Sequence, residues 1–290
     1  MINMDQELCW CGSGKKYEDC HMTNDQKIAI LKQQGKEVPT PDMIKTPAQL
    51  EAIRKACALN TAALDEVSKY VKAGVTTGEL DRIMYDYITS HGGMPGDLGY
   101  YGFPKSVTIS VNDVVCHGIP GDRPYDVLKP GDIVNIDCTT VVDGYYGDAS
   151  RMFCIGKINK KDKELVDITL ECLKRGIAAA QPWGYLGDIG AAVAQLAHKH
   201  GFSVVEEFGG HGVGLDMHEE PFVAHYGKRK TGMVLVPGMV ITIEPMINAG
   251  RKGIYEEEDG WTIRTCDGKK SAQWEHTILI TENGPEILSY

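Results

Sequence analysis

The sequence predicts an α+β fold in which helices cover one curved, largely antiparallel sheet. Helical patterns occur in two pairs, within residues 46–92 and 160–201, and strand-forming segments follow each pair. Two of these segments are joined by Asp143-Gly144, a dipeptide that strongly favours the two-residue turn of an antiparallel hairpin. With 290 residues, of which 42% are hydrophobic, the chain can bury a substantial core without disulfides.

Charge and hydropathy exclude several classes of protein. The longest apolar stretch, Met233 to Ile243, is interrupted by Pro237 and Gly238, so no segment approaches the roughly 20 apolar residues that cross a bilayer. The net charge of −10 argues against a general nucleic-acid-binding protein. The first residues lack the basic and apolar regions of a signal peptide. We therefore expect a cytoplasmic protein with no membrane attachment and no specific DNA binding.

Three of the nine cysteines crowd the N-terminus, where Cys9, Cys11 and Cys20 are followed by His21. Three thiolates and one imidazole complete a tetrahedral zinc shell, and so short a segment would need the metal to fold. A flexible tail with accidental cysteines is the alternative. The segment resembles the SEC-C motif, which implies one structural zinc and a docking role toward protein partners such as the ribosome. The other six cysteines are expected to be buried apolar residues in a reducing compartment.

Three parts of the chain are predicted from these patterns. Residues 1–24 form the zinc-binding module, and residues 46–290 form the main domain. Residues 25–45 are expected to be a linker, because they are polar, contain spaced prolines and show only a short helical pattern at 26–34.

The main domain is expected to start with a helix at Thr46, which can cap the helix and form a capping box with Gln49. Apolar residues at helical spacing continue to Val71, and Gly74 is the expected stop.

The second helix of each pair has a similar sequence. In residues 77–92 and 186–201, a glycine, an acid and an aliphatic residue follow the first residue, and both segments end in His-Gly. The similarity predicts an internal duplication with two halves related by a pseudo-twofold axis, with an accidental match as the alternative.

Four acids interrupt apolar strand patterns, namely Asp137, Asp148, Glu244 and Glu275. A buried carboxylate without a partner costs several kcal/mol, so such acids need cations or strong hydrogen bonds. Closing the hairpin at Val142 and Tyr145 brings Asp148 opposite Thr139. Asp137 then becomes a diagonal neighbour of Asp148 on the same face, roughly 7–8 Å away at Cα. This spacing calls for a cation between the two acids, unless the face is exposed and the acids are merely solvated.

Three histidines lie in segments suited to a site. His117 follows a strand in CHGIP, while His211 and His218 lie in GGHGVGLDMHEEP, whose glycines permit close approach of the backbone. No HExxH pattern is present, so a mononuclear zincin mechanism is unsupported.

These residues resemble the type I methionine aminopeptidases, the dinuclear "pita-bread" metallopeptidases. The resemblance covers residues 46–290 and rests on the segments NDVVCHGIP, GDIVNID, GYYGDASRMF, GGHGVG, HEEP, ITIEPM and DGWTIRTCDGKKSAQWEHT. It implies the pita-bread fold and an enzyme that removes the initiator methionine from the N-termini of nascent proteins when the second residue is small.

The resemblance also implies a dinuclear metal site. Asp137 would bind one ion and His211 and Glu244 the other, while Asp148 and Glu275 would bridge both. Four carboxylates and one imidazole form a hard ligand set that suits Mn²⁺, Fe²⁺ or Co²⁺, and paired ions would activate a bridging water.

Further roles are implied around the metals. His117 would contact the scissile peptide nitrogen, His218 would stabilise the developing oxyanion, and Glu244 would shuttle the proton of the attacking water. The methionine side chain would bind to a set of large side chains, Tyr100, Phe103, Met217 and Trp261, in which Met217 replaces an aromatic residue of the familiar bacterial pattern. Asp97 and Thr108 stand nearby in place of cysteines, so tolerance at the second substrate residue stays open.

Asn112, Val114 and Ser271 occupy the positions that hold a monovalent cation in this family.

Two alternatives to the main prediction remain. A proline-directed aminopeptidase shares the fold and ligands, but usually carries a large extra domain that residues 1–45 cannot supply. A binding protein on a degenerate peptidase fold is the other alternative, against which the presence of all five ligands argues.

Overall fold

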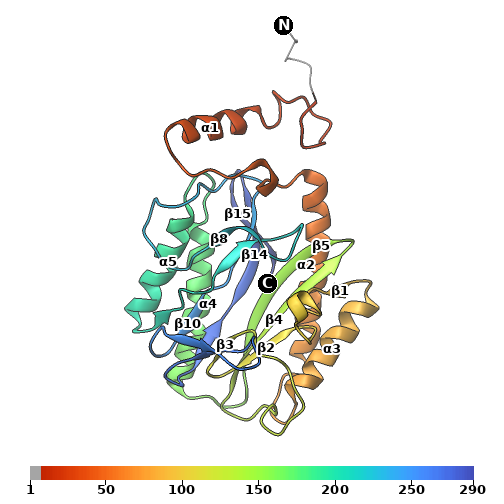
Figure 1. The fold of residues 1–290 in the computed structure, drawn as a ribbon, viewed down its shortest axis with the longest axis vertical. Coiled ribbons are helices and arrows are strands. Elements are labelled where there is room, and N and C mark those ends of the chain that lie inside the picture. The colour runs from red at the N-terminus through yellow and green to blue at the C-terminus, as the bar shows by residue number, and fades with distance from the viewer. Residues whose placement is uncertain (1–7) are drawn as a thin grey trace.

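The computed structural model of the protein describes residues 8–290 (Figure 1). Its helices are α1 (Met22–Gln33), α2 (Pro47–Ser68), α3 (Thr77–Ser90), α4 (Lys160–Ala179) and α5 (Leu186–Lys199), with short 3-10 helices η2 (Pro41–Met43) and η3 (Tyr100–Gly102). None of these helices combines the length and the apolar character that a membrane span requires.

Within residues 8–290 the strands form one large sheet and two small ones, and all pairings between these strands are antiparallel. The large sheet contains β1 (Met94–Pro95), β2 (Thr108–Val111), β4 (Ile133–Val142), β5 (Tyr145–Cys154), β7 (Gly210–Gly212), β8 (Glu219–Val223), β9 (Val240–Ile243), β14 (Glu275–Thr281) and β15 (Gly284–Ser289). The small sheets contain β3 (Val114–Cys116), β6 (Ser203–Val204), β10 (Met246–Asn248), β11 (Ile254–Glu256), β12 (Ile263–Thr265) and β13 (Ser271–Gln273).

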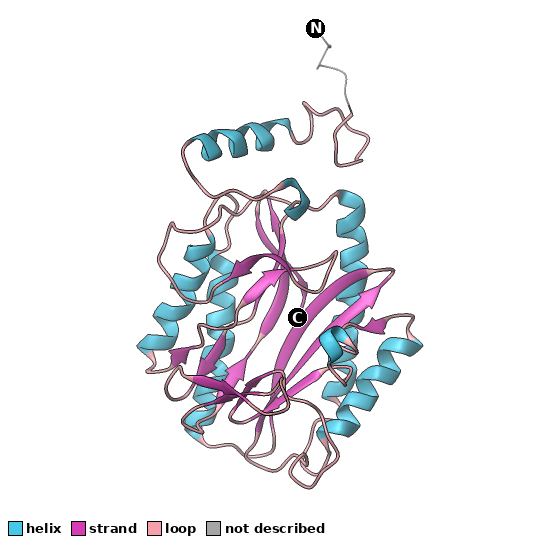
Figure 2. Ribbon diagram, in the orientation of Figure 1, coloured by secondary structure: helices cyan, strands magenta, loops and turns pink. Residues whose placement is uncertain are grey.

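The order of the large sheet is β1-β4-β5-β14-β9-β7-β8, with β2 also paired to β4 and β15 to β14. Helices α2 and α3 pack at one end of this sheet and α4 and α5 at the other, right and left respectively in Figure 1. Figure 2 shows the strands curving between the two helix pairs. This is the α+β pita-bread fold that the sequence predicted.

The hairpin register is confirmed. Thr139 pairs with Asp148 and Asp137 pairs with Ser150, without a bulge between them. Asp143 and Gly144 both have positive φ, 52° and 81°, as a two-residue turn that matches the strand twist requires.

The helix pairs repeat their local contacts, as an internal duplication predicts. An isolated β-bridge joins Thr76, before α3, to Val127, and an equivalent bridge joins Tyr185, before α5, to Val234. The third residue of each helix, Glu79 or Asp188, is an acid whose side chain accepts a hydrogen bond from the backbone N–H three residues earlier. The hydrophobic cores lie beneath these pairs, between the helices and the sheet.

Two predicted elements differ from the structure. Helix α2 ends at Ser68 instead of continuing toward Gly74, although Val71 still packs against the core from the following turn. The strand predicted over residues 239–247 is split into β9 and β10, which belong to different sheets. The break falls at Pro245, because proline has no N–H for the ladder, and it leaves Glu244 at the junction.

The segment between the N-terminal module and the main domain is not simply extended. Its first part is in α1, and its last residues pack on the main domain, where Ile44 is buried and bridges to Met239. The division of the chain at residues 24 and 45 remains a prediction, and residues 1–7 of the predicted module lie outside the described residues.

Candidate active site

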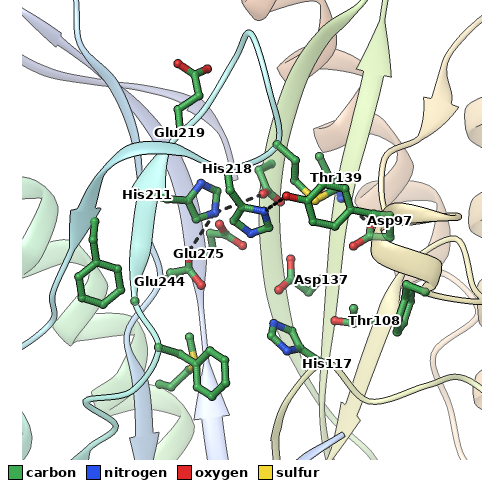
Figure 3. Close-up of a pocket in the computed structure, with 18 of the residues that line it drawn as sticks. Asp97, Thr108, His117, Asp137, Thr139, His211, His218, Glu219, Glu244 and Glu275 are labelled. Carbon is green, nitrogen blue, oxygen red and sulfur yellow. Dashed lines mark hydrogen bonds and ion pairs between the residues drawn. The ribbon is translucent and has the colours of Figure 1, made fainter. Parts of the chain in front are cut away.

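Five neighbouring strands of the large sheet each position one predicted metal ligand. In spatial order these are Asp137 in β4, Asp148 in β5, Glu275 in β14, Glu244 directly after β9, and His211 in β7. The side chains converge on one cavity, as Figure 3 shows for those it labels. Ligand atoms of Asp148, His211 and Glu275 lie within 4.8 Å of one another, which is a spacing suited to a metal ion.

The four carboxyl groups crowd together in a setting that disfavours their charge. Asp148, Glu244 and Glu275 are buried, and Asp137 is partly buried. Burial raises the pKa of Asp137 to about 6. The pKa values of Asp148, Glu244 and Glu275 are raised well above their ordinary values, first by burial and then by the negative charge of neighbouring acids. Bound cations would remove this repulsion.

His211 presents a lone pair to the acids. Its Nδ1 lies 2.9 Å from the carbonyl oxygen of Gly212, which assigns the ring proton to Nδ1. Its Nε2 then faces Oε1 of Glu244 at 3.5 Å and Oδ2 of Asp148 at 3.9 Å. Burial lowers the pKa of His211 to about 3, so the ring is neutral. A bare nitrogen between two carboxylates is a favourable arrangement only when a cation lies among them.

Two residues that the sequence analysis missed hold the carboxylates in place. Thr242 donates its hydroxyl to Oε1 of Glu244 at 2.8 Å and accepts the backbone N–H of His211 at 3.0 Å. Gln273 donates to Glu244 at 3.3 Å and to Asp137 at 3.4 Å. The sequence could have identified both residues, because each is a polar residue inside a buried strand and lies two positions before a predicted ligand.

The cavity has a volume of about 530 Å³, and all four side chains predicted to hold methionine line it: Tyr100, Phe103, Met217 and Trp261. Phe103 and Trp261 meet edge to face with ring centroids 5.1 Å apart. Asp97 and Thr108 also line the cavity, and Asp97 accepts the backbone N–H of Thr139 at 3.1 Å. The sequence analysis did not identify Phe208 and Phe222, which add aromatic surface to the wall.

Two further histidines face the same cavity. His117 has a positive φ of 57°, uncommon for a residue other than glycine, and its ring meets Phe208 edge to face at 5.3 Å. Burial lowers the pKa of His117 to about 4. His218 lies 4.3 Å from His211 between ring centroids, and its Nδ1 is 2.7 Å from the hydroxyl of Tyr100.

The N-terminal cluster forms a second candidate metal site. The ligand atoms of Cys9, Cys11, Cys20 and His21 lie within 4.8 Å of one another. The sulfurs of Cys11 and Cys20 are 3.6 Å apart, too far for a disulfide and close to the roughly 3.8 Å edge of a tetrahedron with 2.3 Å Zn–S bonds.

The residues predicted to hold a monovalent cation lie outside the cavity. The backbone carbonyl of Asn112 accepts the N–H of Ser271 at 2.8 Å, and Val114 follows in β3. The structure therefore brings Asn112 and Ser271 together.

Two family models match the chain. The model of metallopeptidase family M24 covers residues 51–282, and that of the SEC-C motif covers residues 7–23. Both matches agree with the two candidate metal sites described above.

The chain is similar to methionine aminopeptidases of several bacteria and, to a lesser degree, to a prolidase. A methionine aminopeptidase of Chlamydia pneumoniae is 46% identical over 97% of this chain and 97% of its own length. One of Escherichia coli K12 is 51% identical over 85% of this chain and 93% of its own length. The crystal structure of methionine aminopeptidase from Rickettsia prowazekii matches 85% of this chain and 99% of that chain with a TM-score of 0.83 and 45% identity. A Pyrococcus furiosus prolidase matches less well, with a TM-score of 0.68, 27% identity and 65% of that chain covered.

Proposed function

The chain belongs to the methionine aminopeptidases of metallopeptidase family M24, and we propose that it removes the initiator methionine from nascent proteins whose second residue is small. The observation that carries this proposal is the convergence of four carboxyl groups and one imidazole, from five adjacent strands, on a cavity walled by large apolar side chains. We place the reaction in the cytoplasm.

The site fits a pair of divalent cations. Oδ1 of Asp148 is buried without a hydrogen-bond partner, and Nε2 of His211 faces two carboxylates. Asp137 would hold one ion, His211 and Glu244 the other, and Asp148 and Glu275 both. This hard donor set suits Mn²⁺, Fe²⁺ or Co²⁺. When bound, the ions would lower the pKa of a shared water and polarise the scissile carbonyl.

Three side chains complete the chemistry in this proposal. Glu244 accepts the proton of the attacking water, because it lies at the cluster and is held by two hydrogen-bond donors. His218 donates Nε2–H to the carbonyl oxygen as it gains negative charge, with its Nδ1 occupied by the hydroxyl of Tyr100. His117, a neutral ring at neutral pH, meets the scissile peptide nitrogen.

Selectivity for methionine follows from the wall of the cavity. Phe103, Trp261 and Tyr100 offer aromatic surface, and the flexible thioether of Met217 adapts to an unbranched side chain. The second substrate residue is small because it must fit beside His117.

A metal titration with two classes of peptide tests the proposal. Metal-free protein is supplied with Mn²⁺, Fe²⁺ or Co²⁺ and assayed on Met-Ala-Ser and on a matched Xaa-Pro-Ser peptide. We expect hydrolysis of Met-Ala-Ser to depend on metal and to exceed that of the proline peptide by at least about 100-fold, the scale of rejection by a shaped pocket. Preference for Xaa-Pro would support the proline-directed alternative, and no hydrolysis with any metal would support the binding-protein alternative.

The N-terminal module is proposed to bind one structural zinc and to dock on the ribosome. Its described residues, 8–24, do not line the cavity, and they lie at one end of the molecule, at the top in Figure 1. Deleting residues 1–35 should reduce co-sedimentation with ribosomes while leaving peptide hydrolysis nearly unchanged. Equal sedimentation of both forms would reject docking.

A monovalent cation bound by Asn112, Val114 and Ser271 is also proposed. The close approach of Asn112 and Ser271 supports it. Raising K⁺ or Na⁺ at constant ionic strength should raise the melting temperature, and no response to either ion would reject the site.

A further inference from the structure

Lys45 is a buried cation that joins the N-terminal segment to the loop carrying His218. Only 2% of its side chain is exposed. Its Nζ forms an ion pair with Oε2 of Glu219 and also lies 3.4 Å from the carbonyl oxygen of Asp42. Its backbone N–H donates to Gly238 at 2.9 Å, so the main chain at Lys45 is anchored to the catalytic domain.

Glu219 uses its other oxygen to order the loop between β7 and β8. Its Oε1 accepts the backbone N–H of Leu215 at 2.6 Å and that of Asp216 at 3.2 Å. The next two residues are Met217, which lines the cavity, and His218. A single carboxylate therefore joins Lys45 on one side to this active-site loop on the other.

Glu219 lines the same cavity as His218, but its side chain is directed away from the carboxylate cluster. Figure 3 shows His218 pointing toward the carboxylate cluster and Glu219 pointing away from it. Only 16% of the Glu219 side chain is exposed, so loss of Lys45 would leave a mostly buried negative charge with no cation to balance it. A carboxylate in that position lowers its free energy by turning toward solvent. This movement would release the backbone N–H groups of Leu215 and Asp216.

From these contacts we propose that Lys45 is a positioning residue, which holds His218 and Met217 in place by keeping Glu219 on the loop backbone. The inference rests on the proposed function, because it assigns Lys45 to the same reaction. The coupling makes the end of the N-terminal segment part of the catalytic unit. It also predicts that Lys45 affects turnover although it does not line the cavity.

The test compares Lys45→Met with a matched control, Ile44→Val, in the full-length protein with saturating Mn²⁺. Met keeps the apolar stem of lysine and removes the charge. Ile44→Val weakens the packing of the adjacent buried residue and leaves the ion pair intact. We expect Lys45→Met to lower kcat on Met-Ala-Ser by about tenfold or more, because small displacements of a group at the reacting centre are costly. The change in KM should be smaller, and Ile44→Val should change kcat by less than about twofold.

A double mutant shows whether the effect passes through the loop. If Lys45 acts through His218, adding Lys45→Met to His218→Ala should lower kcat by less than about twofold further. Hydrogen exchange of residues 213–218 should be faster in Lys45→Met than in the wild type or in Ile44→Val. Should Lys45→Met fail to fold, Glu219→Gln breaks the same pair from the loop side and carries the same expectations.

Three results would overturn the proposal: an unchanged kcat in Lys45→Met, an equal loss in the wild-type and His218→Ala backgrounds, or an equal loss in Ile44→Val. Failure of the wild type to cleave methionyl peptides would instead reject the proposed function. The exchange measurement does not need hydrolysis, so it still tests whether Lys45 orders the loop.

Discussion

Replacing Glu244 by glutamine perturbs the proposed active site with little change in shape. In the wild type, Oε1 accepts from the hydroxyl of Thr242 at 2.8 Å and Oε2 accepts from Gln273 at 3.3 Å. The glutamine oxygen can keep the first contact. Its amide group then points N–H toward the N–H of Gln273, so one hydrogen bond, one negative charge and one metal-binding oxygen are lost.

The substitution should have opposite effects on activity and on metal-free stability. Loss of a proton acceptor costs roughly 10²–10⁴-fold in rate, so we expect kcat to fall at least about 100-fold, or ~2.7 kcal/mol. Burial and the charge of Asp137 raise the pKa of Glu244 well above its ordinary value. A neutral amide avoids that unfavourable ionisation, so metal-free Glu244→Gln should melt at a higher temperature than metal-free wild type.

The assay measures kcat on Met-Ala-Ser at saturating Mn²⁺, together with thermal melting after metal removal. Glu207→Gln is the matched control, because Glu207 lines the same cavity but is exposed and stands outside the carboxylate cluster. The control should keep kcat within about twofold of wild type. Retention of more than about a tenth of wild-type kcat by Glu244→Gln would refute its role as proton acceptor.

Three more predictions follow from the geometry. Asp97→Asn should stabilise the protein more at pH 8 than at pH 5 in urea unfolding. Burial, and then the charge of Asp137, raise the pKa of Asp97 well above its ordinary value. The folded wild type therefore binds more protons than the unfolded chain and loses stability as pH rises, whereas asparagine does not ionise. A gain independent of pH would contradict this. Cys11→Ser should remove one equivalent of zinc by mass spectrometry with kcat changed less than about twofold, and full zinc retention would reject the Cys₃His site. Gln273→Leu should weaken Mn²⁺ binding by about 10–100-fold in calorimetry, because it removes the hydrogen-bond donor to Asp137 and Glu244. Unchanged affinity would show that Gln273 does not support the metals.

The catalytic hairpin could be predicted because its determinants are local. Asp143-Gly144 defines the turn, the turn defines the register, and the register places Asp137 beside Asp148 on one face. The helix over residues 77–90 could be predicted for the same reason, since its apolar periodicity is local and its N-cap Thr76 and the stop at Gly92 directly flank the segment.

Contacts between distant segments could not be predicted from local rules. The break at Pro245 is visible in the sequence, but which sheet each half joins depends on pairings with residues far along the chain. The order β5-β14-β9, which brings Glu275 and Glu244 to Asp148, likewise follows from sheet assembly. The strand patterns had marked Glu275 and Glu244 as acids inside apolar strands, but only the resemblance to a known family assigned them to one metal site with Asp148.

The sequence by itself determined the kinds of group that this protein brings to a metal: acids within apolar strands, a histidine among glycines, and three cysteines with a histidine near the N-terminus. Their chemistry requires partners whatever the fold, because buried charge is costly and short segments cannot build a core. Only the tertiary structure decided which groups meet. The pairing of Lys45 with Glu219 joins residues 174 positions apart, and no local pattern marks it. Such contacts depend on how whole elements pack, which is why the link between the N-terminal segment and the active-site loop appears only in the folded chain.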